Sequence, residues 1–341
     1  MLAARFSGIG DIQVLPVPTS QELPDGCVRI RVAAAGICGS DLHNFQTGQW
    51  LSRCPVTPGH EFSGTITQTS GNCGPLTVGT HVIADSRVGC GTCQRCRSGR
   101  RNLCRNLSFV GESCDGGFAQ EVILPATQVL PFPDTLPLRY GALVEPLSVS
   151  LHAVNRLAPT PGSPVVICGG GTIGGLAALL LRQQGHDVHM LERSIGRQTL
   201  LAETIGTAPL PLDAEDWNIL FGSEGPAFIL DATGAAPVVE MACQRLAPGG
   251  RLVLAGIFHH TPRIDLNLVV ERELDIRGVS AFADEMPEAI QRLPGLIPFL
   301  DRLITPAATL TDLPALYTHL LSGSEKRLKT LIAPNGTDGT W

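Results

Sequence analysis

Residues 164–183 read PVVICGGGTIGGLAALLLRQ, and this stretch decides the fold of about half of the chain. Its first five residues are continuously apolar apart from the leading proline, which is typical of a short, buried parallel strand. Residues 169–174 then satisfy the pattern G-x-G-x-x-G, and an apolar helix is expected over 172–184. A strand, a glycine-rich turn and a helix in this order predict a Rossmann unit that binds a dinucleotide.

Each glycine of the pattern has a stereochemical role. Gly169 allows the tight turn, Gly171 lets the backbone approach a pyrophosphate, and Gly174 lets the helix pack closely on the strand. The helix N-terminus offers free N–H groups and a partial positive charge to the phosphates. The alternative is a glycine-rich turn without a ligand, and the strand and helix on either side argue against it.

An acidic residue follows about 20 residues later, as this pattern requires. Glu192 ends a strand predicted over 188–191. A carboxylate there accepts hydrogen bonds from the hydroxyl groups of the adenosine ribose and repels a 2′-phosphate. We therefore expect NAD as the coenzyme. Arg193 is the next residue and would favour the phosphate, which keeps NADP as the less favoured alternative.

The chain has 341 residues, which is long for one core and favours two domains. Residues 148–284 alternate predicted strands with predicted helices, which indicates a parallel sheet covered on both faces. These strands lie at 164–168, 188–191, 227–230, 251–256 and 274–279, and the helices at 172–184, 196–205 and 236–246, with one more helix at 146–157 across the domain boundary.

Residues 1–147 have a different pattern and predict a mainly β, barrel-like domain. Short β-type runs occur at 28–34, 64–68, 81–84 and 119–124. We expect residues 285–341 to return and complete this domain. That segment contains predicted helices at 287–293 and 313–322, a last strand at 328–333, and a tail from 335 that we expect to be loose.

Composition excludes several classes of protein. The net charge of −6 argues against nucleic acid as a partner, and no apolar stretch reaches the roughly 18–20 residues that a membrane span needs. The first residues lack the apolar core of a signal peptide, so the eleven cysteines are expected to be thiols and metal ligands. We predict a cytoplasmic protein that acts on a small molecule.

Residues 89–104 read GCGTCQRCRSGRRNLC and place four cysteines close together in the sequence. Cys90, Cys93, Cys96 and Cys104 can reach one point, and four thiolates form the closed coordination of a structural zinc. The alternative, a zinc ribbon that binds nucleic acid, is disfavoured because the nearby arginines form no stripe and no aromatic residues interleave with them.

A second, open metal site is predicted from three short segments. Residues 36–43 read GICGSDLH, residues 58–62 read PGHEF, and residues 143–146 read LVEP. A catalytic zinc takes three protein ligands and leaves one position open. Cys38, His60 and either Glu61 or Glu145 meet that count, and the two glutamates can exchange as the site works.

In this order, GICGSDLH, PGHEFSG, the four-cysteine lobe, VEPLSVSLHA and GGGTIGG resemble the zinc-dependent medium-chain dehydrogenase/reductase family. The resemblance runs from about residue 5 to residue 333. The branch it resembles most contains sorbitol, L-idonate and L-threonine dehydrogenases. It implies an α/β protein, with a GroES-like, mainly β catalytic domain split around a Rossmann doubly wound parallel-sheet coenzyme domain, and the active site between them.

The resemblance also implies roles for single residues. It assigns Cys38, His60 and Glu61 to the catalytic zinc, with Glu145 as a further or alternating ligand. Ser40 corresponds to the residue that bonds the substrate alcohol. His43 corresponds to the surface end of a proton relay, and Asp41 to the carboxylate that orients the histidine ligand. Ile173, Glu192 and Arg197 fall on positions that hold the dinucleotide.

The implied function is hydride transfer between a secondary alcohol, such as a polyol, sugar alcohol or sugar acid, and NAD. Relatives are dimers or tetramers, so a homo-oligomer is expected. Two departures bear on the substrate: Asn44-Phe45 replaces a Tyr-Tyr type of pair, and Ala281 stands where polyol enzymes tend to carry an arginine. The alternatives are an L-threonine-type amino-alcohol 3-dehydrogenase and a non-catalytic member of the family.

Overall fold

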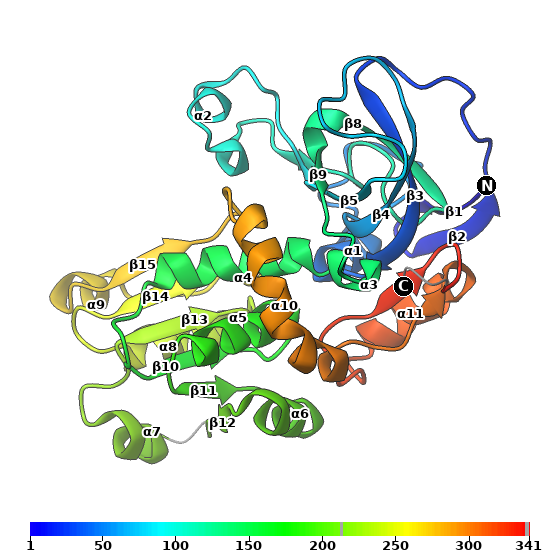
Figure 1. Cartoon of the computed structure of the whole chain (residues 1–341). Coiled ribbons are helices and arrows are strands. Elements are labelled where there is room, and N and C mark those ends of the chain that lie inside the picture. Colours follow the sequence, from blue (N-terminus) through cyan, green and yellow to red (C-terminus); the bar gives the residue numbers. More distant parts are fainter. Residues whose placement is uncertain (212–213, 338–340) are drawn as a thin grey trace.

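The computed structural model describes residues 1–211, 214–337 and 341, and two large sheets organise it (Figure 1). The first is a six-stranded parallel sheet with the strand order β12-β11-β10-β13-β14-β15. Its strands are β10 (Val165–Cys168), β11 (Val188–Leu191), β12 (Ala208–Pro209), β13 (Phe228–Asp231), β14 (Arg251–Leu254) and β15 (Asp275–Gly278).

Strand β10 is apolar on both faces because both faces of this sheet are covered. Val165 and Ile167 belong to the core shared with helices α4, α5 and α10, whereas Val166 and Cys168 belong to the core shared with α7 and α8. The helices of this half are α4 (Val144–Leu157), α5 (Thr172–Gln183), α6 (Ile195–Ile205), α7 (Ala214–Phe221), α8 (Ala236–Arg245), α9 (Leu266–Glu271) and α10 (Met286–Leu303).

The second sheet has seven strands, which come from both the N-terminal and the C-terminal segments of the chain. Its order is β16-β17-β3-β4-β5-β9, with β8 paired to β3. The strands are β3 (Cys27–Gly36), β4 (Glu61–Thr69), β5 (His81–Ala84), β8 (Glu121–Pro125), β9 (Val129–Pro131), β16 (Ala308–Thr309) and β17 (Leu331–Ala333). The C-terminal segment thus returns to the seven-stranded sheet, where β17 pairs with β3, as Figure 1 shows by the red strand beside the blue ones.

Smaller elements complete this half and carry the polar loops. They are the hairpin β1 (Leu2–Gly8) and β2 (Asp11–Pro16), the pair β6 (Arg87–Val88) and β7 (Ser108–Phe109), and the helices α1 (Gly39–Thr47), α2 (Gln94–Arg97), α3 (Leu138–Gly141) and α11 (Leu313–Leu321). A β sheet joined to a parallel sheet covered by helices confirms the predicted α/β class. The exact domain boundaries at 147/148 and 284/285 stay predictions.

Two expectations for the C-terminal segment are wrong. The helix predicted over 287–293 continues through Pro294 and Pro298 to Leu303, because Leu293, Leu296 and Leu300 are all buried on one face. That burial outweighs the local cost of the two prolines. The predicted loose tail is held at both ends. Asn335 donates hydrogen bonds to the carbonyl of Val32, in the seven-stranded sheet, and to the carbonyl of Gln120, just before β8. Arg139 donates one to the carbonyl of Trp341, while residues 338–340 lie outside the described part of the chain.

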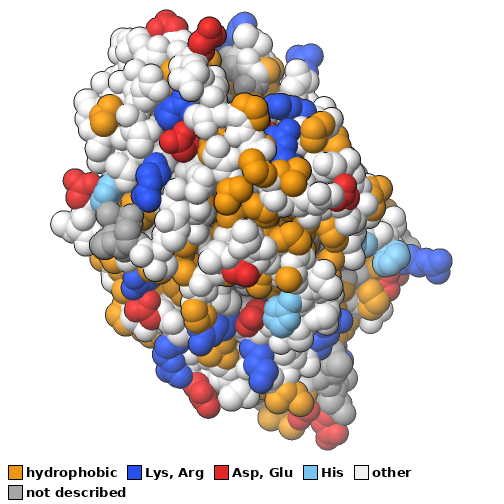
Figure 2. Space-filling model, turned by 90° about the vertical axis from the view of Figure 1, so that its right-hand side faces the viewer, with side chains coloured by type: hydrophobic (Ala, Val, Ile, Leu, Met, Phe, Trp, Pro, Cys, Tyr) orange, Lys and Arg blue, Asp and Glu red, His pale blue; other side chains and the backbone are white. Residues whose placement is uncertain are grey.

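Direct bonds join the two halves and position the regions where metal ligands are predicted. Arg87 of β6 is buried and donates to the carbonyls of Phe282 and Ala283, which follow β15. Figure 2 shows one face of the molecule, where basic and acidic side chains are interspersed around a group of hydrophobic ones. Among the described helices, none is both long enough and apolar enough to cross a bilayer.

Candidate metal and coenzyme sites

The four predicted cysteine ligands converge in the loop that contains α2. The sulfur atoms of Cys90, Cys93, Cys96 and Cys104 all lie within 4.8 Å of one another. Cys93 Sγ is 3.9 Å and Cys90 Sγ is 3.5 Å from Cys104 Sγ. A tetrahedron with metal–sulfur arms of about 2.3 Å has edges of about 3.8 Å, so the cluster has the dimensions of a Cys₄ zinc site.

Backbone N–H groups point at these sulfur atoms and favour thiolates. The amide of Cys93 donates to Cys90 Sγ at 3.4 Å, and the amide of Asn106 donates to Cys104 Sγ at 3.4 Å. Hydrogen bonds from the backbone of Thr92 and Cys93 lower the pKa of Cys90 to about 6. Backbone hydrogen bonds also lower the pKa of Cys93, whereas burial raises the pKa of Cys96 to about 12. The loop thus favours the thiolate form, which binds a metal, at Cys90 and Cys93.

The cysteine lobe docks on the parallel-sheet half through one residue pair. Asn102 Nδ2 donates to the carbonyl of Ser280, and Ser280 Oγ donates back to the carbonyl of Asn102. Both bonds depend on the conformation of the segment between Cys96 and Cys104. A metal that cross-links these cysteines therefore also stabilises the contact between the two halves.

Replacing Cys96 with Ala is expected to release one of two zinc equivalents and to loosen the lobe, because three remaining thiolates cannot close the tetrahedron. Most arginine side chains of residues 95–105 are already exposed, and a loosened backbone then allows trypsin to cleave beside them. Zinc analysis together with timed trypsin digestion checks this prediction. Cys54→Ala is the matched control, since Cys54 is exposed and outside both clusters. Two retained zinc equivalents with an unchanged digestion pattern contradict the structural role.

A second group of metal-ligand atoms combines Cys38, His60 and Glu61. One atom of each lies within 4.8 Å of the others, and His60 and Glu61 are buried. Cys38 precedes α1, while His60 and Glu61 enter β4, so the loop and the strand bring the three together. A thiolate, an imidazole and a carboxylate are a donor set of the kind found at catalytic zinc sites with an open position.

Glu61 has a partner that the sequence analysis did not identify. Lys329 Nζ lies 2.7 Å from Glu61 Oε1 and 2.6 Å from Oε2, and it also donates to the carbonyl of Ile37 at 3.0 Å. Burial alone would lower the pKa of Lys329, but Glu61, Cys38 and Glu145 together outweigh it and hold that pKa above its ordinary value. A Cβ on Gly36 would collide with the Glu61 carboxylate, so this glycine makes room for the ion pair.

Glu145 lies apart from the three-residue group but is coupled to it. It is buried at the start of α4, and its Oε1 accepts a hydrogen bond from Ser86 Oγ at 2.9 Å. Burial raises the pKa of Glu145 to about 7, partly offset by His60. The structure thus brings Glu61 to the cluster with Cys38 and His60, and places Glu145 at its edge.

Helix α1 carries two polar residues that flank the His60 ring. Ser40 Oγ lies 3.5 Å from His60 Nε2, and Asp41 Oδ1 lies 3.7 Å from His60 Nδ1. Asp41 is itself fixed, because its other oxygen accepts from the amide of Cys38 at 2.9 Å. A carboxylate beside Nδ1 favours a proton there and leaves Nε2 free on the side of Ser40.

His43 is not at the surface, so that expectation is wrong. Its ring is buried against Trp50, with ring centres 4.2 Å apart, and against His259 from the parallel-sheet half, at 4.9 Å. His43 Nε2 lies 2.9 Å from Gln49 Oε1, while its Nδ1 is buried and has no hydrogen-bond partner in the described part of the chain. The ring therefore stands at the junction of the two halves with one nitrogen unused.

The glycine-rich loop has the geometry that its pattern predicts. Gly169 has a φ of +95°, and a Cβ on Gly174 would collide with the Gly169 carbonyl. No atom lies within 4 Å of a Cβ built on Gly171, so this backbone faces open space. Ile173 follows at the start of α5, where its carbonyl accepts a hydrogen bond from Ser150. The loop thus combines close helix–strand packing with an exposed backbone at Gly171.

Glu192 lies beside this loop and is held by several donors. Its Oε2 accepts from the amide of Gly170 at 2.7 Å, and its Oε1 accepts from the amide of Ser194 at 2.8 Å. Arg197 Nη1 is 3.3 Å from Oε2, while the neighbouring Arg193 is exposed. The carboxylate is therefore fixed at the end of β11, next to the loop that is predicted to bind the pyrophosphate.

Four further residues near these sites were missed by the sequence analysis: Lys329, Ser86, Glu112 and His259. Only Lys329 has a signal in the sequence. The chain contains two lysines, Lys326 and Lys329, and the second lies two residues before a buried apolar strand. The others come from loops that meet the sites through the tertiary fold alone.

The fold and these clusters define a dinucleotide-binding protein with two metal-ligand sets, and the comparisons assign its family. A model of the alcohol dehydrogenase GroES-like domain matches residues 24–134, and a model of zinc-binding dehydrogenases matches residues 172–294. The (R,R)-butanediol dehydrogenase of Neisseria gonorrhoeae is 30% identical, over 98% of this chain and 100% of the relative. The sorbitol dehydrogenase of Bacillus subtilis is 29% identical, over 95% and 94%.

Solved structures agree with this assignment. A putative zinc-binding dehydrogenase from Sinorhizobium meliloti bound to NADP superposes with a TM-score of 0.89 at 30% identity, covering 98% of this chain and 99% of that one. The 2R,3R-butanediol dehydrogenase of Bacillus subtilis gives a TM-score of 0.88 at 27% identity with the same coverage. The chain belongs to the zinc-dependent medium-chain dehydrogenase/reductase family. It is an oxidoreductase of the alcohol dehydrogenase type, and both the family and the GroES-like and Rossmann fold were predicted.

Proposed function

We propose that this protein oxidises a small secondary alcohol to a ketone with NAD, or catalyses the reverse reduction. The observation that carries the proposal is the convergence of Cys38, His60 and Glu61 within 4.8 Å, beside the hydroxyl group of Ser40. Zinc held by these three residues would act as a Lewis acid that acidifies an alcohol. Glu145 interacts electrostatically with His60 and Glu61, and we propose it as a further ligand.

The protein's own residues position the alcohol and its proton. Ser40 Oγ faces the Nε2 side of His60, so it is placed to accept a hydrogen bond from the substrate hydroxyl. Asp41 keeps the His60 ring in one orientation. His43 retains a buried nitrogen without a partner, which fits a group that takes up the proton at the domain junction. The nicotinamide coenzyme supplies the hydride chemistry.

The test is a substrate panel with the purified, zinc-loaded protein. Polyols, vicinal diols, sugar acids and L-threonine are supplied with NAD or NADP while the absorbance of the reduced coenzyme is followed. Turnover of at least one diol or polyol is expected. Preferred oxidation of L-threonine would favour the amino-alcohol alternative. No turnover of any alcohol, with zinc bound, would favour a non-catalytic member of the family.

Replacing Glu192 with Ala is expected to lower the NAD-to-NADP ratio of kcat/KM about 10- to 100-fold. A hydrogen bond to a charged group is worth about 1.5–3 kcal/mol, and only the unphosphorylated ribose can donate to this carboxylate. Glu203→Ala is the control, since Glu203 is an exposed residue of α6. The substitution also removes the hydrogen bonds from Glu192 to the amides of Gly170 and Ser194. Losing these bonds should weaken the binding of NAD and NADP equally, so the ratio reports on the ribose contact alone. An unchanged ratio contradicts the proposed role.

We also propose that the protein is a cytoplasmic homo-oligomer. Two features support self-association. Strand β15 is the last strand of the parallel sheet, and the neighbouring α9 exposes Leu266 and Val270, with 72% and 75% of their surfaces accessible. An unpaired strand edge beside exposed apolar side chains is a surface that a second copy can cover.

A further inference from the structure

Glu112 is a buried carboxylate near the Cys38, His60 and Glu61 group, and the mechanism above does not use it. It lies in the loop between β7 and β8 and is only 6% exposed. Within the described residues, no lysine, arginine or histidine forms an ion pair with it. Its side chain accepts one hydrogen bond, from Asn44 Nδ2 at 3.2 Å. Burial of a carboxylate without a cation is costly, and it raises the pKa of Glu112 to about 7.

The bond to Asn44 places Glu112 on the substrate side of helix α1. Asn44 lies four residues after Ser40, and residues at this spacing share one face of a helix. Ser40 faces His60 Nε2. The carboxylate of Glu112 interacts electrostatically with both His60 and Asp41. Phe109, the last residue of β7, has its ring centre 6.4 Å from that of His60. Asn44, and Glu112 bonded to it, thus lie on the same side of α1 as Ser40.

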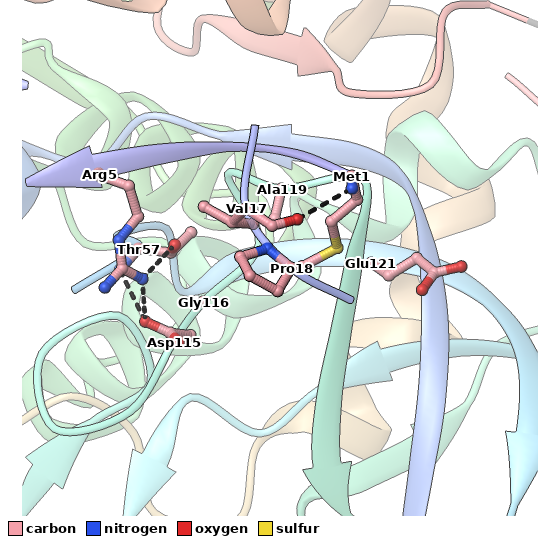
Figure 3. A pocket seen from close by; sticks show the side chains of 9 residues that line it. All are labelled: Met1, Arg5, Val17, Pro18, Thr57, Asp115, Gly116, Ala119 and Glu121. Carbon is pink, nitrogen blue, oxygen red and sulfur yellow. Dashed lines mark hydrogen bonds and ion pairs between the residues drawn. The ribbon is translucent and has the colours of Figure 1, made fainter. Parts of the chain in front are cut away.

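The loop that carries Glu112 is anchored, so its carboxylate is held in place. Asp115 accepts from Arg5 Nη1 and from the amide of Thr57, both at 2.9 Å (Figure 3). The same loop is tied at its other end, because the amide of Glu112 donates to the carbonyl of Phe109 at 3.0 Å. A buried acceptor on a fixed loop is preorganised for a ligand that brings a donor.

We propose that Glu112, oriented by Asn44, is a specificity-determining residue that accepts a hydrogen bond from a second hydroxyl group of the substrate. The inference rests on the proposed function and narrows its substrate to an uncharged diol or polyol. A substrate that carries its own carboxylate at this position would be repelled. This assignment also gives a role to Asn44, one of the two residues that depart from the aromatic pair of polyol enzymes.

The test compares three four-carbon alcohols that differ in one group: 2-butanol, 2,3-butanediol and 3-hydroxybutyrate. In the wild-type protein, kcat/KM for the diol is expected to exceed that for 2-butanol by about tenfold or more, because a site built to bond a hydroxyl rejects an analogue without it. Glu112→Leu is expected to bring this ratio close to one. The ratio is diagnostic, because a general loss of activity would lower kcat/KM for both alcohols alike.

Glu112→Gln is the second variant and preserves the fold, since its amide oxygen still accepts from Asn44 and can bond a hydroxyl. It is expected to keep most of the diol preference and to raise kcat/KM for 3-hydroxybutyrate about tenfold, because the repulsive charge is gone. Glu22→Leu, at an exposed position of the same half, is the control. Binding of 2,3-butanediol in the presence of coenzyme, followed by tryptophan fluorescence, should weaken in parallel in Glu112→Leu.

The outcomes separate the inference from the function on which it rests. An equal diol-to-alcohol ratio in the wild-type protein and in Glu112→Leu overturns the inference, even if both alcohols are oxidised. Unchanged discrimination against 3-hydroxybutyrate in Glu112→Gln also counts against it. By contrast, a zinc-loaded wild-type protein that oxidises none of the full panel refutes the proposed function itself.

Discussion

Replacing Cys38 with Ala is expected to lower bound zinc from two equivalents to one and to reduce kcat/KM about 1000-fold or more. Cys38 supplies the only sulfur in the group with His60 and Glu61. Two remaining ligands would hold the metal poorly. A Lewis acid lowers the activation free energy by several kcal/mol, and about 1.4 kcal/mol corresponds to a factor of ten in rate. Metal analysis and steady-state kinetics on the same preparation measure both effects.

The fold should survive this substitution, which makes the loss of activity interpretable. The structural contribution of Cys38 comes mostly from its backbone, whose amide donates to Asp41 at the start of α1, and Ala keeps that bond. The thermal unfolding curve of the metal-free variant is therefore expected to match that of the metal-free parent. Cys54→Ala serves as the control for a cysteine outside both clusters. Retained turnover with a single zinc equivalent would refute the catalytic assignment.

Sequence reasoning works well for these clusters because their ligands lie close together along the chain. The four cysteines span fifteen residues, and His60 and Glu61 are adjacent, so local spacing alone predicts which atoms meet. The Rossmann loop is equally local, since its strand, turn and helix follow one another directly. Strand β11 and strand β5 were predicted with the bounds that the structure has, because each is a short apolar run between polar residues.

Contacts between distant segments could not be predicted in this way. Lys329 meets Glu61 from 268 positions away, and Glu112 meets Asn44 from 68 positions away. Neither pair has a spacing that a pattern can detect. The same limit explains the error at α10, where two prolines indicated an end to the helix. Whether a proline ends a helix depends on the burial of its neighbours, which only the packed structure determines.

Replacing Lys329 with Met is expected to destabilise the protein by about 3–5 kcal/mol at neutral pH, because the buried Glu61 carboxylate then loses the ammonium group that pairs with it. Lys329 is fully enclosed, and its ammonium group bonds both oxygens of Glu61 and the carbonyl of Ile37. Methionine has a similar length but offers no charge and no donor. Calorimetric unfolding of metal-free protein measures the loss without a contribution from zinc binding.

A double variant separates loss of the charge pair from loss of packing. In Lys329→Met combined with Glu61→Gln, no buried charge remains, so most of the lost stability should return. Lys326→Met is the matched control, because the other lysine of the chain is exposed and its replacement should leave stability unchanged. If the single and double variants unfold at the same temperature, the ammonium group is not what stabilises Glu61 in this core.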